Sequence, residues 1–281
     1  MLIINNEMIA QKKTTYLHDW VNDEMIRGRY IFTKDDVKNL NLPISDQALQ
    51  NSLNRLIEKG VILSPWQNFY VAIPTEYKLR GVVPPSFYID RLMQFLSRDY
   101  YVSLLTAAAF NGASHQKAMV FQVMTNGGPI RSGIKNGTKL EFTLRQNLPS
   151  EFTRQIKTQT GYMTVSGPEL TALDVVAEES KVGGLSRAAE VLVELCENTS
   201  WDAGKLPLIN CFSSATIQRL GRLLEMIEFC EQADCLYALF KQSGKTMRKI
   251  PLKQTVAIRA DMPIDKRWKI IGNYELDIDE I

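Results

Sequence analysis

The sequence has 281 residues, of which 45% are hydrophobic and 23% charged, and these proportions exclude a disordered or fibrous chain. The formal net charge of +2 also gives no sign of a uniformly basic nucleic-acid-binding protein. The charge is unevenly spread, because residues 81–160 carry 9 basic and 4 acidic side chains whereas residues 161–240 carry 5 and 12. The length is compatible with one large or two moderate domains.

The first elements expected along the chain are a helix, a short strand and a second helix. Apolar residues recur with helical spacing over 16–26, and Gly28 follows where a helix would stop. A short apolar run at 30–32 predicts a strand. Thr33 then stands three residues before Asp36, which resembles a capping box and predicts a helix over about 34–40.

A third helix and a hairpin complete this region. The helix is predicted to begin at Ser45 or Asp46 and to end before Gly60, because polar capping residues and a C-terminal glycine bracket an apolar stripe. Two apolar runs, 61–63 and 69–73, flank a polar turn and predict a β-hairpin. Helix, strand, helix, turn, helix and hairpin is the order of a winged helix-turn-helix.

The outward face of the third helix carries amides and an arginine. Asn and Gln pair with adenine in the major groove and Arg pairs with guanine, so this face predicts DNA binding. A nearby lysine is expected to contact phosphate, and the tip of the hairpin is expected to reach a groove or phosphate. The predicted DNA-binding residues are therefore Lys34, Gln47, Gln50, Asn51, Asn54, Arg55, Gln67 and Asn68. A solvated helix used for protein contact is the alternative, because polar outer faces occur on any amphipathic helix.

The remaining sequence predicts a larger mixed α+β domain. Pro and Gly residues around 81–85 put the boundary near residue 80, which gives a winged helix-turn-helix domain over 1–80 and an α+β domain over 81–281. An Asn-Gly pair at 136–137 is a strong hairpin signal. The expected helices are 86–97, 101–110, one from residue 169, 186–196 and 214–229, and the expected strands are 118–124, 130–134, 139–144, 162–165, 256–259 and 268–271.

Basic side chains cluster in two segments of this second domain, and both are predicted to form functional surface. One cluster belongs to the predicted hairpin, and the other lies in a run over 241–260 that contains no acidic residue. A solvated face is the more common meaning of such a run. The predicted surface residues are Arg131, Lys135, Lys139, Arg145, Lys245, Arg248 and Lys249.

No residue pattern matches a catalytic, cofactor or metal site. The turns at 127–128 and 183–184 lack the lysine of a phosphate-binding loop. With His18 and His115 as the only histidines, a histidine-based hydrolase or a zinc site is disfavoured. The segment 112–115 lacks the acidic residues that a nucleotidyltransferase needs after its Gly-Ser pair. We therefore expect no enzyme, no cofactor and no metal.

The start of the chain predicts a cytoplasmic location. MLIINNEMIAQKK has no basic segment followed by an apolar core, so it does not match a signal peptide. No segment approaches the roughly 18 apolar residues of a membrane span.

Three segments resemble motifs of the AbiEi-type antitoxins. The first is YYVSLLTAA at 100–108, followed by FNGAS at 110–114. The second is VSGPELTALD at 165–174, which resembles the family's sPErTllD stretch with Leu170 where Arg is usual. The third is RLGRLLE at 219–225, which is similar to rlGyLLE. Read from the residues alone, each segment also fits a structural role in helix capping or packing.

The resemblance implies a bacterial two-domain antitoxin of the type IV AbiE toxin–antitoxin system, associated with phage defence. It implies an N-terminal domain that represses the operon by binding inverted repeats in double-stranded promoter DNA. It further implies a C-terminal domain that opposes a nucleotidyltransferase-like toxin without a stable complex. Because residues 1–80 are nearly neutral, we expect a single copy to bind DNA weakly and with strong salt dependence. Cooperative binding by a protein that is a monomer or weak dimer in solution would compensate for this.

Two other functions remain open from the residues. A winged-helix transcription factor whose C-terminal domain senses a ligand or partner would be stabilised by a metabolite. An adaptor that uses the winged helix for protein contact would show no salt-sensitive DNA binding.

Overall fold

The computed structural model describes residues 17–78, 82–113, 120–135 and 137–277. The chain divides into two compact units, Met1–Leu92 (unit 1) and Met93–Ile281 (unit 2). Unit 1 continues past residue 80 because the ring of Phe87 packs edge-on against Tyr30, at 5.4 Å between centroids, and against Tyr77, at 6.0 Å. The predicted α+β class is confirmed, with a largely helical first part followed by a larger α+β part.

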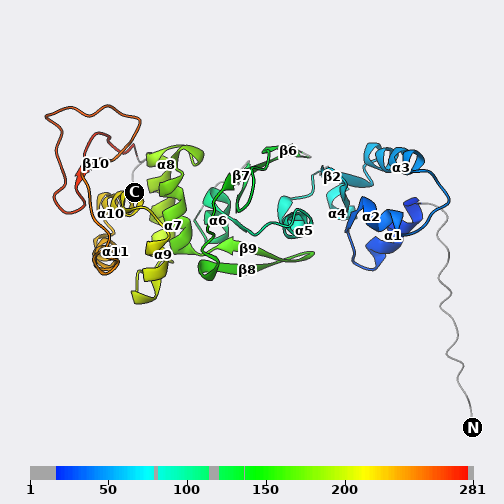
Figure 1. Ribbon diagram of the computed structural model, residues 1–281, viewed down its shortest axis with the longest axis horizontal. Coiled ribbons are helices and arrows are strands. Elements are labelled where there is room, and N and C mark those ends of the chain that lie inside the picture. The colour runs from blue at the N-terminus through cyan, green and yellow to red at the C-terminus, as the bar shows by residue number, and fades with distance from the viewer. Residues whose placement is uncertain (1–16, 79–81, 114–119, 136, 278–281) are drawn as a thin grey trace, which may run out of the picture. The chain divides into compact units, whose positions relative to one another are not determined.

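Unit 1 has the predicted order of elements (Figure 1). Among its described residues, β1, β3 and β2 form an antiparallel sheet in that order. The strand β2 extends to Trp66, so the turn of the hairpin is formed by residues 67–68 and is shorter than the turn predicted between residues 63 and 69. The elements are α1 (Leu17–Ile26), β1 (Ile31–Thr33), α2 (Lys34–Lys38), α3 (Asp46–Glu58), β2 (Ile62–Trp66), β3 (Phe69–Ala72) and α4 (Thr75–Lys78).

Local capping explains why the helices of unit 1 begin and end where they do. Thr33 and Asp36 form the predicted capping box at the start of α2. Ser45 caps α3 by accepting a hydrogen bond from the backbone N–H of Ala48, at 3.2 Å. Gly60 follows α3 with a φ of 64°, a left-handed conformation that favours glycine. The apolar stripe of α3 is buried in the core of this unit, with Leu17, Val21, Phe32, Leu49, Leu53 and Leu56.

The remaining elements start with a 3₁₀ turn, η1 (Pro85–Phe87). They continue with α5 (Ile89–Phe95), β4 (Tyr100–Val102), α6 (Leu104–Phe110), β5 (Val120–Thr125), β6 (Gly133–Lys135), β7 (Thr138–Leu144), β8 (Thr153–Thr158), β9 (Gly161–Ser166), α7 (Pro168–Ala177), α8 (Leu185–Cys196), α9 (Leu206–Asn210), α10 (Ser214–Met226), α11 (Cys230–Gln242), β10 (Ile250–Pro251) and β11 (Ile270–Ile271).

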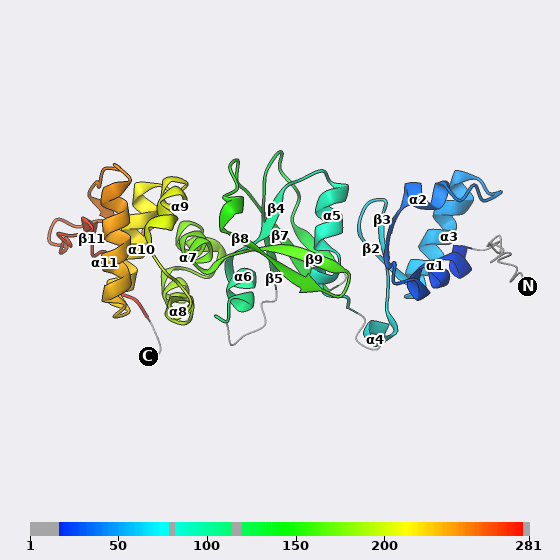
Figure 2. The same ribbon diagram turned by 90° about the horizontal axis from the view of Figure 1, so that it is seen from below.

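Unit 2 consists of a mixed sheet beside a layer of helices (Figure 2). Among the described residues, the sheet has the order β6-β7-β5-β4-β9-β8. The pairs β5–β7 and β4–β9 are parallel, and the other pairs are antiparallel. The helix α6 contacts β5 and α7, and α7 contacts α8 and α10. A continuous apolar core therefore joins the sheet to the helices, from Tyr101 and Leu104 through Leu173 and Leu192 to Trp268.

Several predictions of secondary structure in unit 2 were wrong or incomplete. Tyr101 and Val102 lie in the strand β4 rather than in a helix, because they pair with β5 and β9 on either side. The segment 256–259 is not a strand, and it is mostly exposed. The strand β8 and the helix α11 were not predicted. β8 is an edge strand whose Arg154, Gln155 and Lys157 are exposed, so it lacks the apolar alternation of a covered strand.

Candidate functional site

The predicted DNA-binding residues of α3 fall into two groups. Gln47, Asn51, Asn54 and Arg55 are exposed, and the amide of Gln47 donates to the side-chain oxygen of Asn51 at 3.2 Å. Gln50 is half-buried and donates to Asn54 at 3.1 Å. The first group therefore forms an outward polar face that a ligand could reach.

Lys34 and Gln50 are held by contacts inside unit 1. The ammonium of Lys34 donates to the amide oxygen of Gln50 at 2.8 Å. Gln50 also hydrogen-bonds to the hydroxyl of Tyr70, whose pKa is raised by burial in spite of that bond. These two side chains thus connect α3 to α2 and to the sheet, and they are less free to contact DNA than the sequence suggested.

The tip of the hairpin is the turn between β2 and β3. Gln67 and Asn68 form it, and both are exposed. Asn68 has a φ of 62°, and its carbonyl accepts a hydrogen bond from the backbone N–H of Lys34 at 2.9 Å. The predicted wing is therefore present, and its position is fixed against the start of α2.

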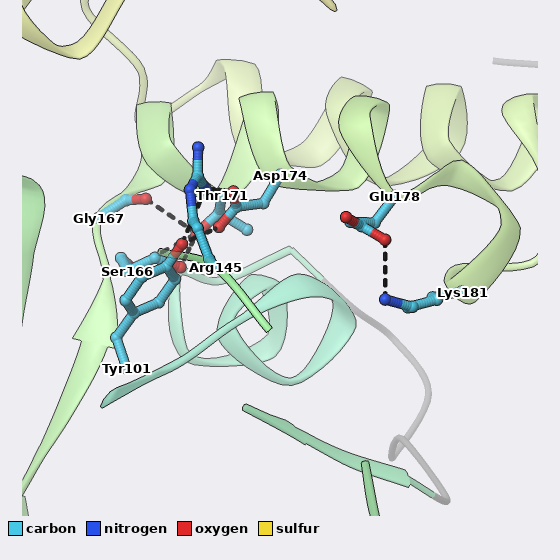
Figure 3. A network of polar contacts seen from close by, with 8 residues as sticks. All are labelled: Tyr101, Arg145, Ser166, Gly167, Thr171, Asp174, Glu178 and Lys181. Carbon is cyan, nitrogen blue, oxygen red and sulfur yellow. Dashed lines mark hydrogen bonds and ion pairs between the residues drawn. The ribbon is translucent and has the colours of Figure 1, made fainter. Parts of the chain in front are cut away.

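A buried polar network lies in unit 2 around Asp174 of α7 (Figure 3). The hydroxyl of Tyr101 donates to one carboxylate oxygen of Asp174 at 3.0 Å, and the guanidinium of Arg145 donates to the other at 2.5 Å. Arg145 also donates to the Tyr101 hydroxyl at 3.0 Å, and it stacks on the ring of Phe212 at 4.1 Å. The side chain of Asp174 is fully buried, whereas that of Arg145 is 17% exposed.

A second group of hydrogen bonds joins the start of α7 to the end of α6. The amide of Asn111 donates to the carbonyl of Ser166 and to the hydroxyl of Thr171, both at 3.0 Å. The hydroxyls of Ser166 and Thr171 share a hydrogen bond of 2.6 Å, and Thr171 also donates to the carbonyl of Gly167 at 2.8 Å. Motif residues more than fifty positions apart in sequence are thus brought together, and they hold α6, β9 and α7 in place.

Burial controls the protonation of this network. The pKa of Asp174 is raised to about 6 because the carboxylate is desolvated, and the bonds from Arg145 and Tyr101 only partly offset this. The pKa of the Tyr101 hydroxyl is raised far above its ordinary value by burial and by the charge of Asp174. Tyr101 therefore acts as a neutral hydrogen-bond donor.

The raised pKa of Asp174 predicts a pH-dependent contribution to stability. The folded state holds this proton more tightly than the unfolded chain does, so the contribution is full below about pH 4 and is lost as the pH rises through about 6. From about pH 4.5 to about pH 7.5, the wild type should therefore lose stability relative to Asp174→Asn, which cannot titrate. Urea unfolding at both pH values measures this difference. Parallel pH profiles for the two proteins would contradict the prediction.

A small pocket of about 220 Å³ opens beside the network. Arg145 and Asp174 line it together with Phe212 and with Ser213 at the start of α10. Glu178 also lines it, but its carboxylate is paired with Lys181 at 2.8 Å (Figure 3). Each charge at this pocket is therefore balanced by an opposite charge, and no reactive arrangement is evident among the residues that line it.

The segment that contains this network matches a known protein family. Residues 101–226 match the family model of the AbiEi antitoxin C-terminal domain. The chain carries an AbiEi antitoxin domain. The resemblance predicted from the three motifs is thereby confirmed, and the match supports an antitoxin of a toxin–antitoxin system.

Two further comparisons concern the whole chain. The crystal structure of the RV2827C protein from Mycobacterium tuberculosis superimposes with a TM-score of 0.65 over 94% of this chain and 92% of that one, at 11% identity. An identity this low shows a likeness of fold alone. No curated protein matches the chain in sequence. In the part of the chain that the structure describes, no helix is long and apolar enough to cross a membrane.

The third motif of the AbiEi domain has a packing role. Arg219 donates to the backbone carbonyl of Leu252 at 3.0 Å. Gly221 lies against the buried indole of Trp268, and Glu225 accepts a hydrogen bond from that indole N–H at 2.9 Å. These residues of α10 thus anchor the C-terminal segment to the AbiEi domain.

The predicted basic surface residues differ in how exposed their side chains are. Arg131, Lys139, Arg248 and Lys249 are exposed, and Lys245 is half-buried. The side chain of Lys135 lies outside the described residues. Arg145 does not belong to the exposed surface of the hairpin, because it follows β7 and pairs with the buried Asp174. No pattern in the sequence predicts this pairing, since no periodicity connects Tyr101, Arg145 and Asp174.

Proposed function

We propose that this antitoxin represses its own operon by binding inverted repeats in double-stranded promoter DNA. The observation that carries this proposal is the exposed amide and arginine face of α3 (Gln47, Asn51, Asn54 and Arg55) within a winged helix-turn-helix order. Residues 1–80 are nearly neutral, so a single copy would bind weakly. The protein would act in the bacterial cytoplasm, as a monomer or weak dimer that binds cooperatively on the repeats.

The exposed amides of α3 should carry operator specificity. The variant Gln47→Ala/Asn51→Ala should lose about 1–3 kcal/mol of binding free energy per base contact on the upstream region of its own operon. Binding to unrelated DNA should change little. Fluorescence anisotropy with the two DNAs measures both affinities. These two side chains are better choices than Gln50, because Gln50 is occupied by Lys34.

A matched control exists in unit 2. Gln146 and Asn147 are exposed and have the same two side-chain types. Gln146→Ala/Asn147→Ala should bind the operator as the wild type does. If the α3 variant also bound normally, the assignment of α3 as the recognition helix would be wrong.

We also propose that the AbiEi domain opposes a nucleotidyltransferase-like toxin as a non-enzymatic regulator, without forming a stable complex with it. The support is the match over residues 101–226 and the exposure of the basic side chains Arg131, Lys139, Arg248 and Lys249. Arg145 is left out of this surface because Asp174 neutralises it. The proposed antitoxin surface consists of Arg131, Lys135, Lys139, Lys245, Arg248 and Lys249.

Charge reversal tests the antitoxin surface. The variant Lys245→Glu/Arg248→Glu/Lys249→Glu should fail to protect cells that express the toxin, because the new charges would repel an acidic partner surface. Growth of toxin-expressing cells measures protection. The control variant Lys59→Glu/Lys157→Glu/Lys266→Glu changes net charge equally at exposed positions elsewhere. Full protection by the first variant would exclude this part of the surface.

A further inference from the structure

A second pocket of unit 2 lies at the N-terminal end of α10 and is called the α10 pocket below. Its volume is about 410 Å³, within the range of about 300–1,000 Å³ that small-molecule sites occupy, whereas the pocket beside Arg145 is smaller than that range. Its lining includes Lys245 and Arg248 and no acidic residue among those described. The α10 pocket is thus the larger of these two and the one with unbalanced positive charge.

Lys245 and Arg248 belong to a segment whose backbone is held by hydrogen bonds from the protein interior. The buried amide of Gln218 donates to the backbone carbonyl of Arg248 at 2.8 Å and to that of Trp268 at 2.5 Å. The ammonium of Lys245 lies 3.4 Å from the carbonyl of Asn210. Within the described residues, the guanidinium of Arg248 has no acceptor. The backbone that carries both cations is therefore positioned before any ligand arrives, which lowers the entropy cost of binding.

The first turn of α10 adds donors to the same pocket. The helix has 13 residues, and the side chain of Ser213 caps the backbone N–H of Thr216 at 3.1 Å. Ser214 and Ala215 line the pocket, and their backbone N–H groups have no acceptor among the described residues. Free N–H groups and the positive end of a helix dipole favour an anion. Ile250 and Ala215 give the rest of the wall an apolar character.

We propose that the α10 pocket binds a phosphate monoester of nucleotide size, with Lys245, Arg248 and the first-turn amides of α10 around the phosphate. A doubly charged phosphate matches two cations and two N–H donors, and the apolar wall accommodates the body of the ligand. This site goes beyond the operator and toxin functions proposed above, because binding to it can be measured without DNA or toxin. The phosphate could belong to a free nucleotide or to the 5′ end of a nucleic acid.

Calorimetric titration of the full-length protein tests the pocket. Adenosine monophosphate should bind, inorganic phosphate should bind more weakly, and adenosine should not bind, because the cations contact the phosphate. A short oligonucleotide with and without a 5′ phosphate distinguishes the two sources. Tighter binding of the phosphorylated form assigns the site to nucleic-acid ends, and equal binding of the two forms assigns it to free nucleotides. Absence of binding by adenosine monophosphate and by phosphate overturns the proposal.

Variants locate the binding within the molecule. Lys245→Gln/Arg248→Gln should weaken adenosine monophosphate binding about tenfold or more, because two charge-assisted contacts are lost. Lys249→Gln is the matched control, since Lys249 is exposed nearby and does not line the pocket. Thermal unfolding confirms that each variant is folded, and Lys245→Gln alone serves if the double variant is not. Unchanged affinity in the pocket variant, or an equal loss in Lys249→Gln, would overturn the proposal.

The two tests separate this pocket from the proposed antitoxin surface. Nucleotide binding by the wild type, together with normal toxin protection by the charge-reversed variant, would support the pocket and exclude the surface. Loss of protection by the charge-reversed variant, without nucleotide binding by the wild type, would support the surface and overturn the pocket.

Discussion

Replacement of Arg145 by methionine should lower the free energy of unfolding of unit 2 by about 3–5 kcal/mol at neutral pH. The change leaves Asp174 fully buried with only the Tyr101 hydroxyl as a partner among the contacts described. A buried carboxylate that loses its counterion retains its desolvation penalty without the compensating attraction. Urea unfolding followed by hydrogen exchange of α7 measures this loss separately from any unfolding of unit 1.

Two comparisons isolate the charge effect at Arg145. The loss should be smaller at about pH 5 than at about pH 7.5, because Asp174 becomes protonated and neutral. Asp174→Asn should destabilise less than Arg145→Met, since the remaining Arg145 is 17% exposed and still stacks on Phe212. A loss below about 1 kcal/mol for Arg145→Met, or a loss independent of pH, would contradict this account of the network.

Substitution of Gly221 by alanine should also destabilise unit 2, by about 1–3 kcal/mol or more. An added Cβ would lie far inside van der Waals contact with three ring atoms of Trp268. The indole cannot easily move, because it is fully buried, donates to Glu225 and packs edge-on against Tyr237 at 5.3 Å. Overpacking should therefore outweigh the roughly 1 kcal/mol that alanine gains over glycine in a helix.

A double-mutant cycle tests the cause of that loss. Trp268→Phe removes the ring atoms that would collide and also breaks the bond to Glu225. If the clash is the cause, Gly221→Ala should be far less destabilising in the Trp268→Phe background. Equal effects of Gly221→Ala in the two backgrounds, measured by urea unfolding, would show that steric contact with Trp268 is not responsible.

Unit 1 could be predicted from its sequence because its signals are local. The Thr33–Asp36 capping box, the Ser45 cap and Gly60 each act within a few residues, and they mark helix ends wherever the rest of the chain lies. The apolar stripe of α3 likewise follows from helical spacing. Its outward amides were predicted as well, although the bond from Lys34 to Gln50 was not.

Unit 2 depends more on contacts between distant segments. Tyr101 and Val102 belong to an apolar run that fits a helix or a strand equally well, and only the neighbouring strands β5 and β9 decide between them. The sequence groups Arg145 with the basic hairpin because its partner Asp174 is remote in sequence. The family motifs indicate important positions more reliably, since Asn111, Thr171 and Asp174 all lie in buried hydrogen-bonded groups.

The operator function is proposed for unit 1 and the antitoxin function for unit 2, so a single strain should separate them. The chain is supplied from an unrelated promoter to cells that carry the toxin and a reporter driven by the native promoter. Growth and reporter activity are then read from the same culture. We expect the wild type to protect and to repress, and Gln47→Ala/Asn51→Ala to protect equally while repression is lost. Loss of protection by this variant at a normal protein level, or full repression by it, would contradict the account.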